Sequence, residues 1–248
     1  MKKKITILII AIIIIAIISN FINNELDGKT IAFIGDSLIE GYGNDSKSFE
    51  YYFADALPNS EIINNARSGA TISDNTGTDD IVLINQVKAL TGYPEVIVFN
   101  GGANDIIGYG LGFIDTNLKK EIGVVEENPN KMSDTNTVIG DLEEAIVEMQ
   151  SRFPEATLCY LQVFLIDDST IDIITIDESK KPDMKSRRNQ LYEQIKILCQ
   201  KRNVKYIDVS DKFKDKGTIY RQEDGIHIKE EGYQMISHYI LEKLKEAI

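Results

Sequence analysis

The chain has 248 residues, of which 43% are hydrophobic and 27% are charged, and its formal net charge is −12 at pH 7. This length and apolar content favour a single folded unit with a substantial core and exclude an intrinsically disordered chain. So acidic a chain also argues against nucleic-acid binding and against docking on anionic lipid.

In residues 1–22, three lysines follow Met1 and an apolar run follows the lysines. A positive start followed by an apolar core is typical of a signal peptide or a signal anchor. At 1.5 Å per residue, residues 5–22 would span about 27 Å, close to the ~30 Å hydrocarbon core of a bilayer. The run lacks a clear small-residue cleavage pattern, so we favour an uncleaved transmembrane anchor over a secreted protein whose signal is removed.

The charges that flank this run predict its orientation. Lysines precede it, whereas Glu25 and Asp27 follow it, which places the rest of the chain outside the cytoplasm. We therefore expect a membrane anchor at 1–22, a short polar linker at 23–28 and one folded domain at 29–248.

The domain alternates between two kinds of apolar pattern. Short apolar runs predict five strands, over residues 30–34, 61–65, 95–99, 157–164 and 204–209. Helical spacing of apolar residues predicts helices over 48–57, 79–90, 138–153 and 188–201, and a final helix that includes Tyr233 and Leu244. This alternation predicts an α/β fold in which a mostly parallel sheet lies between helical layers. Two excursions, 106–135 and 165–185, show no clear periodicity, and we expect loops there.

The first strand ends in Gly35-Asp36-Ser37. In an open parallel sheet, ligands bind at the carboxyl edge of the strands. Ser37 is therefore a candidate nucleophile, and we expect Asp36 to fix the turn around it rather than to carry out acid–base chemistry.

The chain contains only two histidines, so the candidates for a catalytic base are few. His238 lies inside the terminal helix, where a surface or packing role is expected. His227 lies in a turn three residues after Asp224, so this carboxylate can accept from one ring nitrogen and direct the other toward Ser37. Taken alone, the segment from Asp224 to His227 is more typical of a turn with a capping aspartate than of a catalytic pair.

Two further residues follow strand ends and are candidates for binding an oxyanion. Asn104 comes after the third strand and a Gly-Gly pair, so its amide can project over the sheet edge. Gly69 follows the second strand, and its backbone N–H can point into the same crevice. Each is an ordinary turn residue when considered alone. Asp105 is expected to support the site rather than to react.

These blocks together resemble the conserved blocks of the GDSL, or SGNH, hydrolases, from about residue 29 to the C-terminus. The segments that carry the resemblance are Gly35-Asp36-Ser37-Leu38, Gly69, Gly102-Ala103-Asn104-Asp105 and Asp224-Gly225-Ile226-His227. The resemblance implies a flavodoxin-like three-layer α/β/α fold and a serine esterase that needs no cofactor or metal. It also implies that Ser37 is the nucleophile, His227 the base and Asp224 its orienting group.

The same resemblance implies an oxyanion hole made by the backbone amides of Ser37 and Gly69 and the side chain of Asn104. Ile228 is a departure, because many relatives carry proline after the histidine.

Several alternatives stay open at this level. The substrate is expected to be a lipid-type or small acyl ester, with O-acetylated cell-wall or other glycans as the alternative. A non-catalytic, membrane-tethered binding protein is a second alternative. A nucleotide-binding domain is disfavoured, because neither G-x-G-x-x-G before a helix nor a P-loop motif occurs. Cys159 and Cys199 look like core thiols, no metal-binding spacing is present, and the sequence predicts no oligomeric state.

Overall fold

The structure is a computed structural model that describes residues 25–45, 47–74, 81–112, 114, 119–163, 168–210 and 220–246. The predicted anchor, residues 1–22, lies outside these ranges. Among the residues within them, no helix combines the length and apolar character needed to span a bilayer.

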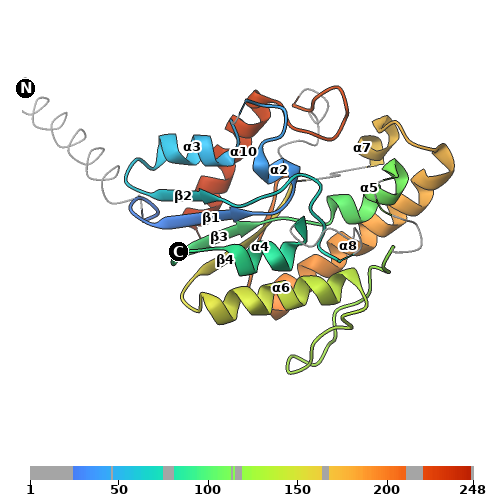
Figure 1. Cartoon of the computed structure of the whole chain (residues 1–248), viewed down its shortest axis with the longest axis horizontal. Coiled ribbons are helices and arrows are strands. Elements are labelled where there is room, and N and C mark those ends of the chain that lie inside the picture. Colours follow the sequence, from blue (N-terminus) through green and yellow to red (C-terminus); the bar gives the residue numbers. More distant parts are fainter. Residues whose placement is uncertain are drawn as a thin grey trace, which may run out of the picture.

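Five parallel strands form one sheet in the order β2-β1-β3-β4-β5 (Figure 1). The strands are β1 (Thr30–Ile34), β2 (Glu61–Asn64), β3 (Val96–Phe99), β4 (Thr157–Gln162) and β5 (Lys205–Asp208). Ile34 at the end of β1 is in register with Phe99 at the end of β3. The segments that follow these two central strands therefore leave the sheet side by side, at the same edge.

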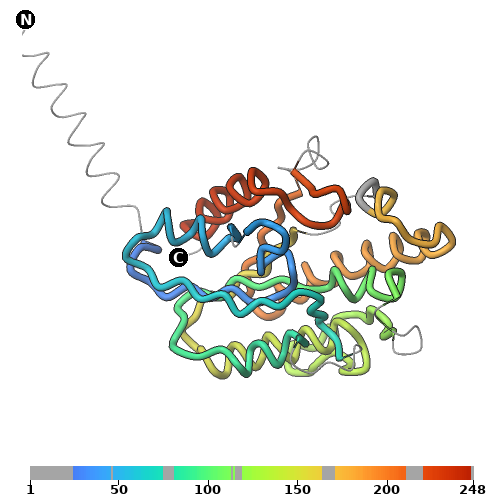
Figure 2. Tube along the Cα trace, turned by 45° about the horizontal axis from the view of Figure 1, so that its top comes forward, coloured from blue at the N-terminus to red at the C-terminus, as the bar shows by residue number. Residues whose placement is uncertain are grey.

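Helices cover both faces of the sheet (Figures 1 and 2). On one face α3 (Phe49–Ala56) packs against α10 (Glu230–Lys245). On the other face α6 (Val138–Arg152) packs against both α4 (Leu83–Ala89) and α8 (Lys181–Lys201). Strands β1 and β3 are almost wholly buried, as expected for a parallel sheet between helical layers. The predicted three-layer α/β/α fold is confirmed.

The first excursion is only partly irregular. Helix α5 (Ala103–Leu111) occupies its beginning, where the sequence analysis expected a loop. Gly108 and Gly110 lie inside this helix, and glycine lowers helix propensity by about 1 kcal/mol per residue. Because residues 103–109 are all buried, packing rather than local propensity stabilises α5.

The second excursion also contains helices. Helix α7 (Asp168–Ile173) and the 3₁₀ turn Glu178–Lys180 lie within it, and α8 begins at Lys181 rather than at 188. The first turns of α8 are mostly charged, so no apolar period marks them. Pro182 is tolerated there because the first helical turn needs no intrahelical N–H bond.

Cys159 on β4 and Cys199 on α8 are both free and buried. Burial raises the pKa of each thiol to about 12, which keeps both protonated at neutral pH. Both residues are core thiols, as the sequence predicts.

Glu143 of α6 is a fully buried carboxylate that holds three neighbours. It accepts hydrogen bonds from Ser133 N at 2.6 Å, Lys201 Nζ at 2.7 Å and Arg202 Nε at 2.7 Å. Burial acts to raise the pKa of Glu143, but these bonds outweigh it and leave the pKa below its ordinary value. The carboxylate thereby fastens the irregular segment after α5 to the ends of α6 and α8.

We expect Glu143→Gln to lower the free energy of unfolding by about 3 kcal/mol at pH 7, since it leaves Lys201 and Arg202, whose side chains are 8% and 19% exposed, without their counter-charge. Because the pKa of Glu143 is depressed in the folded state, its contribution to the free energy of unfolding is fully present above pH 4.5, the ordinary glutamate value. This contribution is lost as the pH falls through the folded-state pKa. Urea unfolding of wild type and variant should therefore converge at acidic pH. Glu144→Gln, at the exposed neighbouring position, is the matched control and should change stability little.

Candidate active site

Ser37 is the first residue of a short helix, α2 (Ser37–Glu40), that starts directly after β1. Asp36 is the N-cap of this helix, and its Oδ1 accepts from Leu38 N at 2.9 Å. Helix N-termini present N–H groups without intrahelical partners, so the Ser37 amide is available to an incoming group. Asp36 thus fixes the turn around Ser37.

Two side-chain amides, those of Gln86 and Asn100, form hydrogen bonds with the backbone of this turn. Gln86 of α4 accepts from Gly35 N at 2.8 Å and donates to Gly35 O at 2.9 Å. Asn100, directly after β3, accepts from Asp36 N at 3.0 Å and donates to Asp36 Oδ1 at 2.9 Å. Gly35 has a φ of +143°, and the Asn100 side chain occupies the space that a Cβ would need. The residue before Asp36 must therefore be glycine.

A chain of hydrogen bonds links Ser37 to the last loop of the domain. His227 Nε2 lies 2.9 Å from Ser37 Oγ, and His227 Nδ1 lies 2.6 Å from Asp224 Oδ2. The other carboxylate oxygen of Asp224 accepts from Ile226 N at 2.8 Å and His227 N at 2.9 Å. The structure thus brings together serine, histidine and aspartate in the order that nucleophilic catalysis requires.

The environment of Asp224 favours its ionised form. Partial burial acts to raise the pKa of Asp224, but the hydrogen bonds from the His227 side chain and from two backbone amides outweigh it. The pKa is therefore below its ordinary value, and the group stays a carboxylate at neutral pH. An ionised Asp224 holds the proton of the imidazole on Nδ1 and leaves Nε2 free to accept from Ser37.

The segments that carry Gly69 and Asn104 contact each other, and the Gly69 loop also contacts α2, the helix of Ser37. Gly69 has a φ of +80°, and Asn104 Nδ2 donates to Ala70 O at 2.7 Å, in the same loop. An amide nitrogen carries two donors, so this bond leaves Asn104 one N–H for another acceptor. Ser37 and Asn104 are each only 8% exposed.

Asp105 and Glu40 fasten the loop that carries Gly69. Asp105 is buried, and its carboxylate accepts from Ile72 N at 2.8 Å and from Ser73 N at 3.1 Å. Burial raises the pKa of Asp105. Glu40, at the end of α2, accepts from both the backbone and the hydroxyl of Ser68. Both carboxylates therefore hold this loop in place.

Three supporting residues were not predicted from the sequence: Glu40, Gln86 and Asn100. Gln86 has a recognisable sequence signal, because it is the polar residue on the otherwise apolar buried face of α4. Asn100 carried a weaker one, as a polar residue directly after a buried strand.

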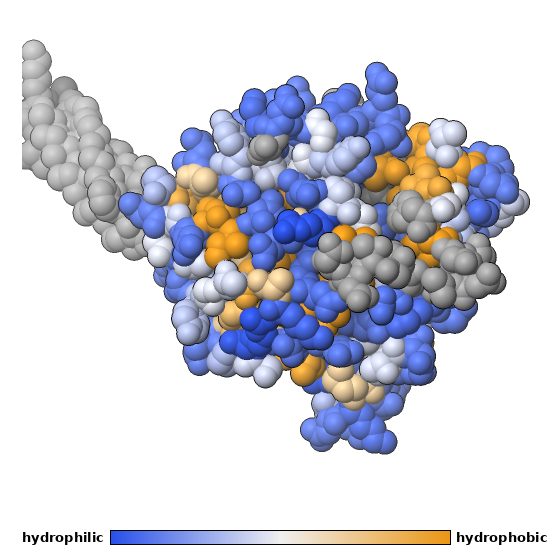
Figure 3. All heavy atoms as spheres, viewed as in Figure 1, coloured by the Kyte–Doolittle hydropathy of each residue, from blue (hydrophilic) through white to orange (hydrophobic). Residues whose placement is uncertain are grey.

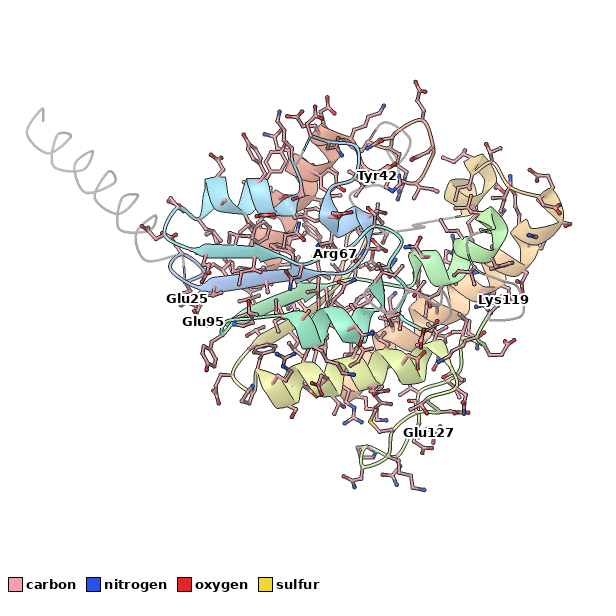
Figure 4. The ribbon with its side chains drawn as sticks, in the orientation of Figure 1. Glu25, Tyr42, Arg67, Glu95, Lys119 and Glu127 are labelled. Atoms are coloured by element: carbon pink, nitrogen blue, oxygen red, sulfur yellow. The ribbon has the colours of Figure 1, made fainter. Side chains whose placement is uncertain are left out.

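Tyr42, whose ring contacts His227, marks the end of the sheet at which the site lies (Figure 4). Tyr42 and Arg67 lie at the end toward which the strands point, whereas Glu25 and Glu95 lie at the other end. Within the part of the chain that the structure describes, no group of three or more His, Cys, Asp and Glu residues could hold a metal ion.

If Asn104 binds an oxyanion, Asn104→Ala should lower kcat for ester hydrolysis by about 10²–10³-fold with little change in KM. The amide is expected to act on the charge that develops in the transition state rather than on the bound ester. Asn59→Ala, at the opposite end of the sheet, is the control and should leave kcat unchanged. An equal loss in both variants, or a loss confined to KM, would contradict this role.

Known proteins share the sequence pattern and the fold of this chain. The sequence model of the GDSL-like lipase/acylhydrolase family matches residues 33–235. Similar solved structures include a Lactobacillus plantarum protein, with 16% identity, a TM-score of 0.67 and coverage of 90% of this chain and 99% of that one. An extracellular lipase from Streptomyces rimosus has 15% identity, a TM-score of 0.59 and coverage of 85% and 99%.

LAE5, an alpha/beta hydrolase enzyme from the metagenome of Lake Arreo, has 17% identity, a TM-score of 0.57 and coverage of 87% and 94%. At these identities the likeness to solved structures shows a shared fold. No curated protein shows significant similarity to this sequence.

Proposed function

Because this chain belongs to the GDSL-like lipase/acylhydrolase family, a family of ester hydrolases, we propose that it cleaves carboxylic esters through an acyl-enzyme on Ser37. The observation that carries the proposal is the hydrogen-bonded chain from Ser37 Oγ through His227 to Asp224. A serine hydroxyl is a weak nucleophile, and an adjacent oriented base is what activates it.

In the proposed cycle, His227 Nε2 takes the proton of Ser37 as Oγ forms a bond to the ester carbonyl carbon. The resulting imidazolium passes this proton to the alcohol oxygen as the ester C–O bond breaks, which leaves an acyl-serine. His227 then takes a proton from water, and the hydroxide attacks the acyl-serine. The carboxylic acid departs, and Ser37 regains its proton.

Three donors are proposed to bind the oxyanion that forms at each attack: the backbone amides of Ser37 and Gly69 and the Asn104 side chain. The Ser37 amide lies at a helix start, and Asn104 has one N–H beyond its bond to Ala70. Fixed donors of this kind stabilise developing negative charge without having to reorganise.

Exposed apolar side chains beside the site favour an ester with an apolar acyl chain. Ile173 of α7 is 47% exposed, and its side chain lies against Gly225, between Asp224 and His227. Figure 3 shows apolar side chains gathered at the α7 end of the molecule, and Leu111 at the end of α5 is 41% exposed. Such a surface would bury an acyl chain better than a polar glycan.

We further propose that the enzyme acts outside the cytoplasm, held by residues 1–22. The lysines ahead of the apolar run and the acidic residues after it support this orientation. Protease treatment of intact cells or spheroplasts tests it, because only a domain outside the cytoplasmic membrane would be digested.

Labelling with a fluorophosphonate, followed by peptide mapping, tests the chemistry. We expect the label on Ser37 alone, and an unlabelled Ser37 would instead favour a non-catalytic binding protein. A chain-length series of p-nitrophenyl esters, assayed beside an acetylated glycan, then tests the substrate. Highest kcat/KM for acyl chains longer than acetyl supports a lipid-type ester, whereas activity confined to acetyl groups would favour a glycan O-acetyl esterase.

A further inference from the structure

We propose that Tyr42 is a positioning residue for His227. It lies in a strap, residues 41–45, that joins the helix of the nucleophile to the loop of the base. The inference rests on the proposed esterase function, because it concerns how the catalytic histidine is held.

The Tyr42 side chain packs directly on the imidazole. The two ring centroids are 4.5 Å apart, and the ring planes are tilted by 36°. Tyr42 is nevertheless 54% exposed, so burial in the core does not account for where its ring lies. An exposed aromatic ring held on the candidate base, at the end toward which the strands point (Figure 4), indicates a role in the site.

The backbone of Tyr42 links the nucleophile to the base. Tyr42 N donates to Ser37 O at 3.1 Å, and Tyr42 O accepts from Gln222 Nε2 at 3.0 Å. Gln222 belongs to the last loop, where its own N–H donates to His227 O at 2.8 Å. The backbone N–H of Tyr42 is therefore bonded to the carbonyl of Ser37, and its backbone carbonyl is bonded to the loop that carries His227.

Further contacts fix the strap to the same loop. Gln222 Nε2 and Asn44 Nδ2 both donate to Ile228 O, at 3.0 Å and 2.5 Å. Gly43 has a φ of +79°, and the Gln222 amide lies 2.8 Å from where a Cβ would stand. The strap and the loop thus fit closely over several residues.

His227 needs such support because its own partner is open to solvent. The side chain of Asp224 is 41% exposed, so water competes for the carboxylate that orients the imidazole. A ring packed on the imidazole limits its rotation and excludes water from one of its faces. Displacement of a catalytic group by about 1 Å can cost 10²-fold in rate, so a modest loss of order at His227 would be visible in kcat.

The kinetic experiment compares Tyr42→Ala with Tyr42→Phe, which keeps the ring, and with Tyr51→Ala, which removes an exposed tyrosine on α3. We expect Tyr42→Ala to lower kcat about tenfold or more with KM changed less than twofold. Tyr42→Phe and Tyr51→Ala should both stay within twofold of wild type. An unchanged kcat in Tyr42→Ala, a change in KM alone, or an equal loss in Tyr42→Phe would overturn the proposal. Tyr42→Leu serves as the second ring-free variant if Tyr42→Ala does not fold.

A spectroscopic readout separates this inference from the esterase proposal itself. The chain has only two histidines, so ¹⁵N-histidine labelling gives one signal set for His227 and one for His238, on an exposed position of α10. We expect the downfield Nδ1–H proton of His227 to exchange with water faster in Tyr42→Ala than in wild type or Tyr42→Phe, while the His238 signals stay unchanged. An unaltered Nδ1–H signal in Tyr42→Ala would overturn the positioning role. If a fluorophosphonate did not label Ser37 in the wild-type protein, that result would instead overturn the esterase mechanism.

Discussion

Replacing Ser37 with alanine should lower kcat for ester hydrolysis by about 10⁶-fold and abolish labelling by fluorophosphonates. The variant keeps His227, Asp224 and the oxyanion donors, but no atom remains that can form the acyl-enzyme. The fold should survive, because Ser37 Oγ contributes one hydrogen bond, to His227, and α2 keeps its Asp36 cap. Circular dichroism and urea unfolding of the purified variant check this.

The matched control for that experiment is Ser186→Ala. Ser186 lies at an exposed position in α8, where alanine is the better helix former, so both activity and stability should be retained. If Ser37→Ala hydrolysed a p-nitrophenyl ester at the wild-type rate, another group would have to be the nucleophile.

The sequence predicts the sheet well because its strands are short apolar runs, and the central strands β1 and β3 are buried on both faces. Runs such as Ile31–Ile34 are continuously apolar and are bounded by polar or glycine residues, which is typical of parallel strands. The helices of the two covering layers are amphipathic. The helical spacing of their apolar residues predicts them. Helix α5 was missed because tertiary burial, rather than local propensity, makes it helical. The spacing of apolar residues in a single sequence does not show that a segment is buried on all sides in the fold.

The candidate site could be predicted where residues are chemically unusual for their position. A serine, an asparagine and a histidine directly after strands or in the last turn stand out, and the structure joins Ser37 to His227. The supporting contacts could not be predicted in the same way. Asn100 and Gln86 act through bonds to the backbone of residues far away in sequence, and such pairs become visible only when the strand register is known.

Tyr42 illustrates the same limit. Its residue type and its place after Gly41 are ordinary for a loop, and only the ring contact with His227, far along the chain, indicates a function. The contacts of Tyr42 with His227 and Gln222 join segments from the two ends of the domain.

Asp224→Asn should lower kcat by as much as 10⁴-fold, the loss expected when the orienting carboxylate of a Ser-His-Asp triad becomes an amide. The structure gives a specific reason. One oxygen of Asp224 accepts from two backbone N–H groups, of Ile226 and His227, and the other accepts from His227 Nδ1. An asparagine has a single oxygen, and the two backbone donors claim it. The NH₂ group then faces Nδ1 and requires it to be an acceptor.

That arrangement places the imidazole proton on Nε2. A protonated Nε2 points its N–H toward Ser37 and cannot accept the serine proton. The 41% exposure of the Asp224 side chain tempers the loss, because water can replace the amide as the partner of Nδ1 in part of the molecules. The ¹⁵N shifts of His227 at neutral pH report the tautomer directly, and we expect protonation of Nδ1 in the wild type and of Nε2 in the variant. Asp208→Asn, at the end of β5, is the control and should leave both the tautomer and kcat unchanged. Wild-type kcat in Asp224→Asn, with the proton still on Nδ1, would show that the carboxylate does not orient the base.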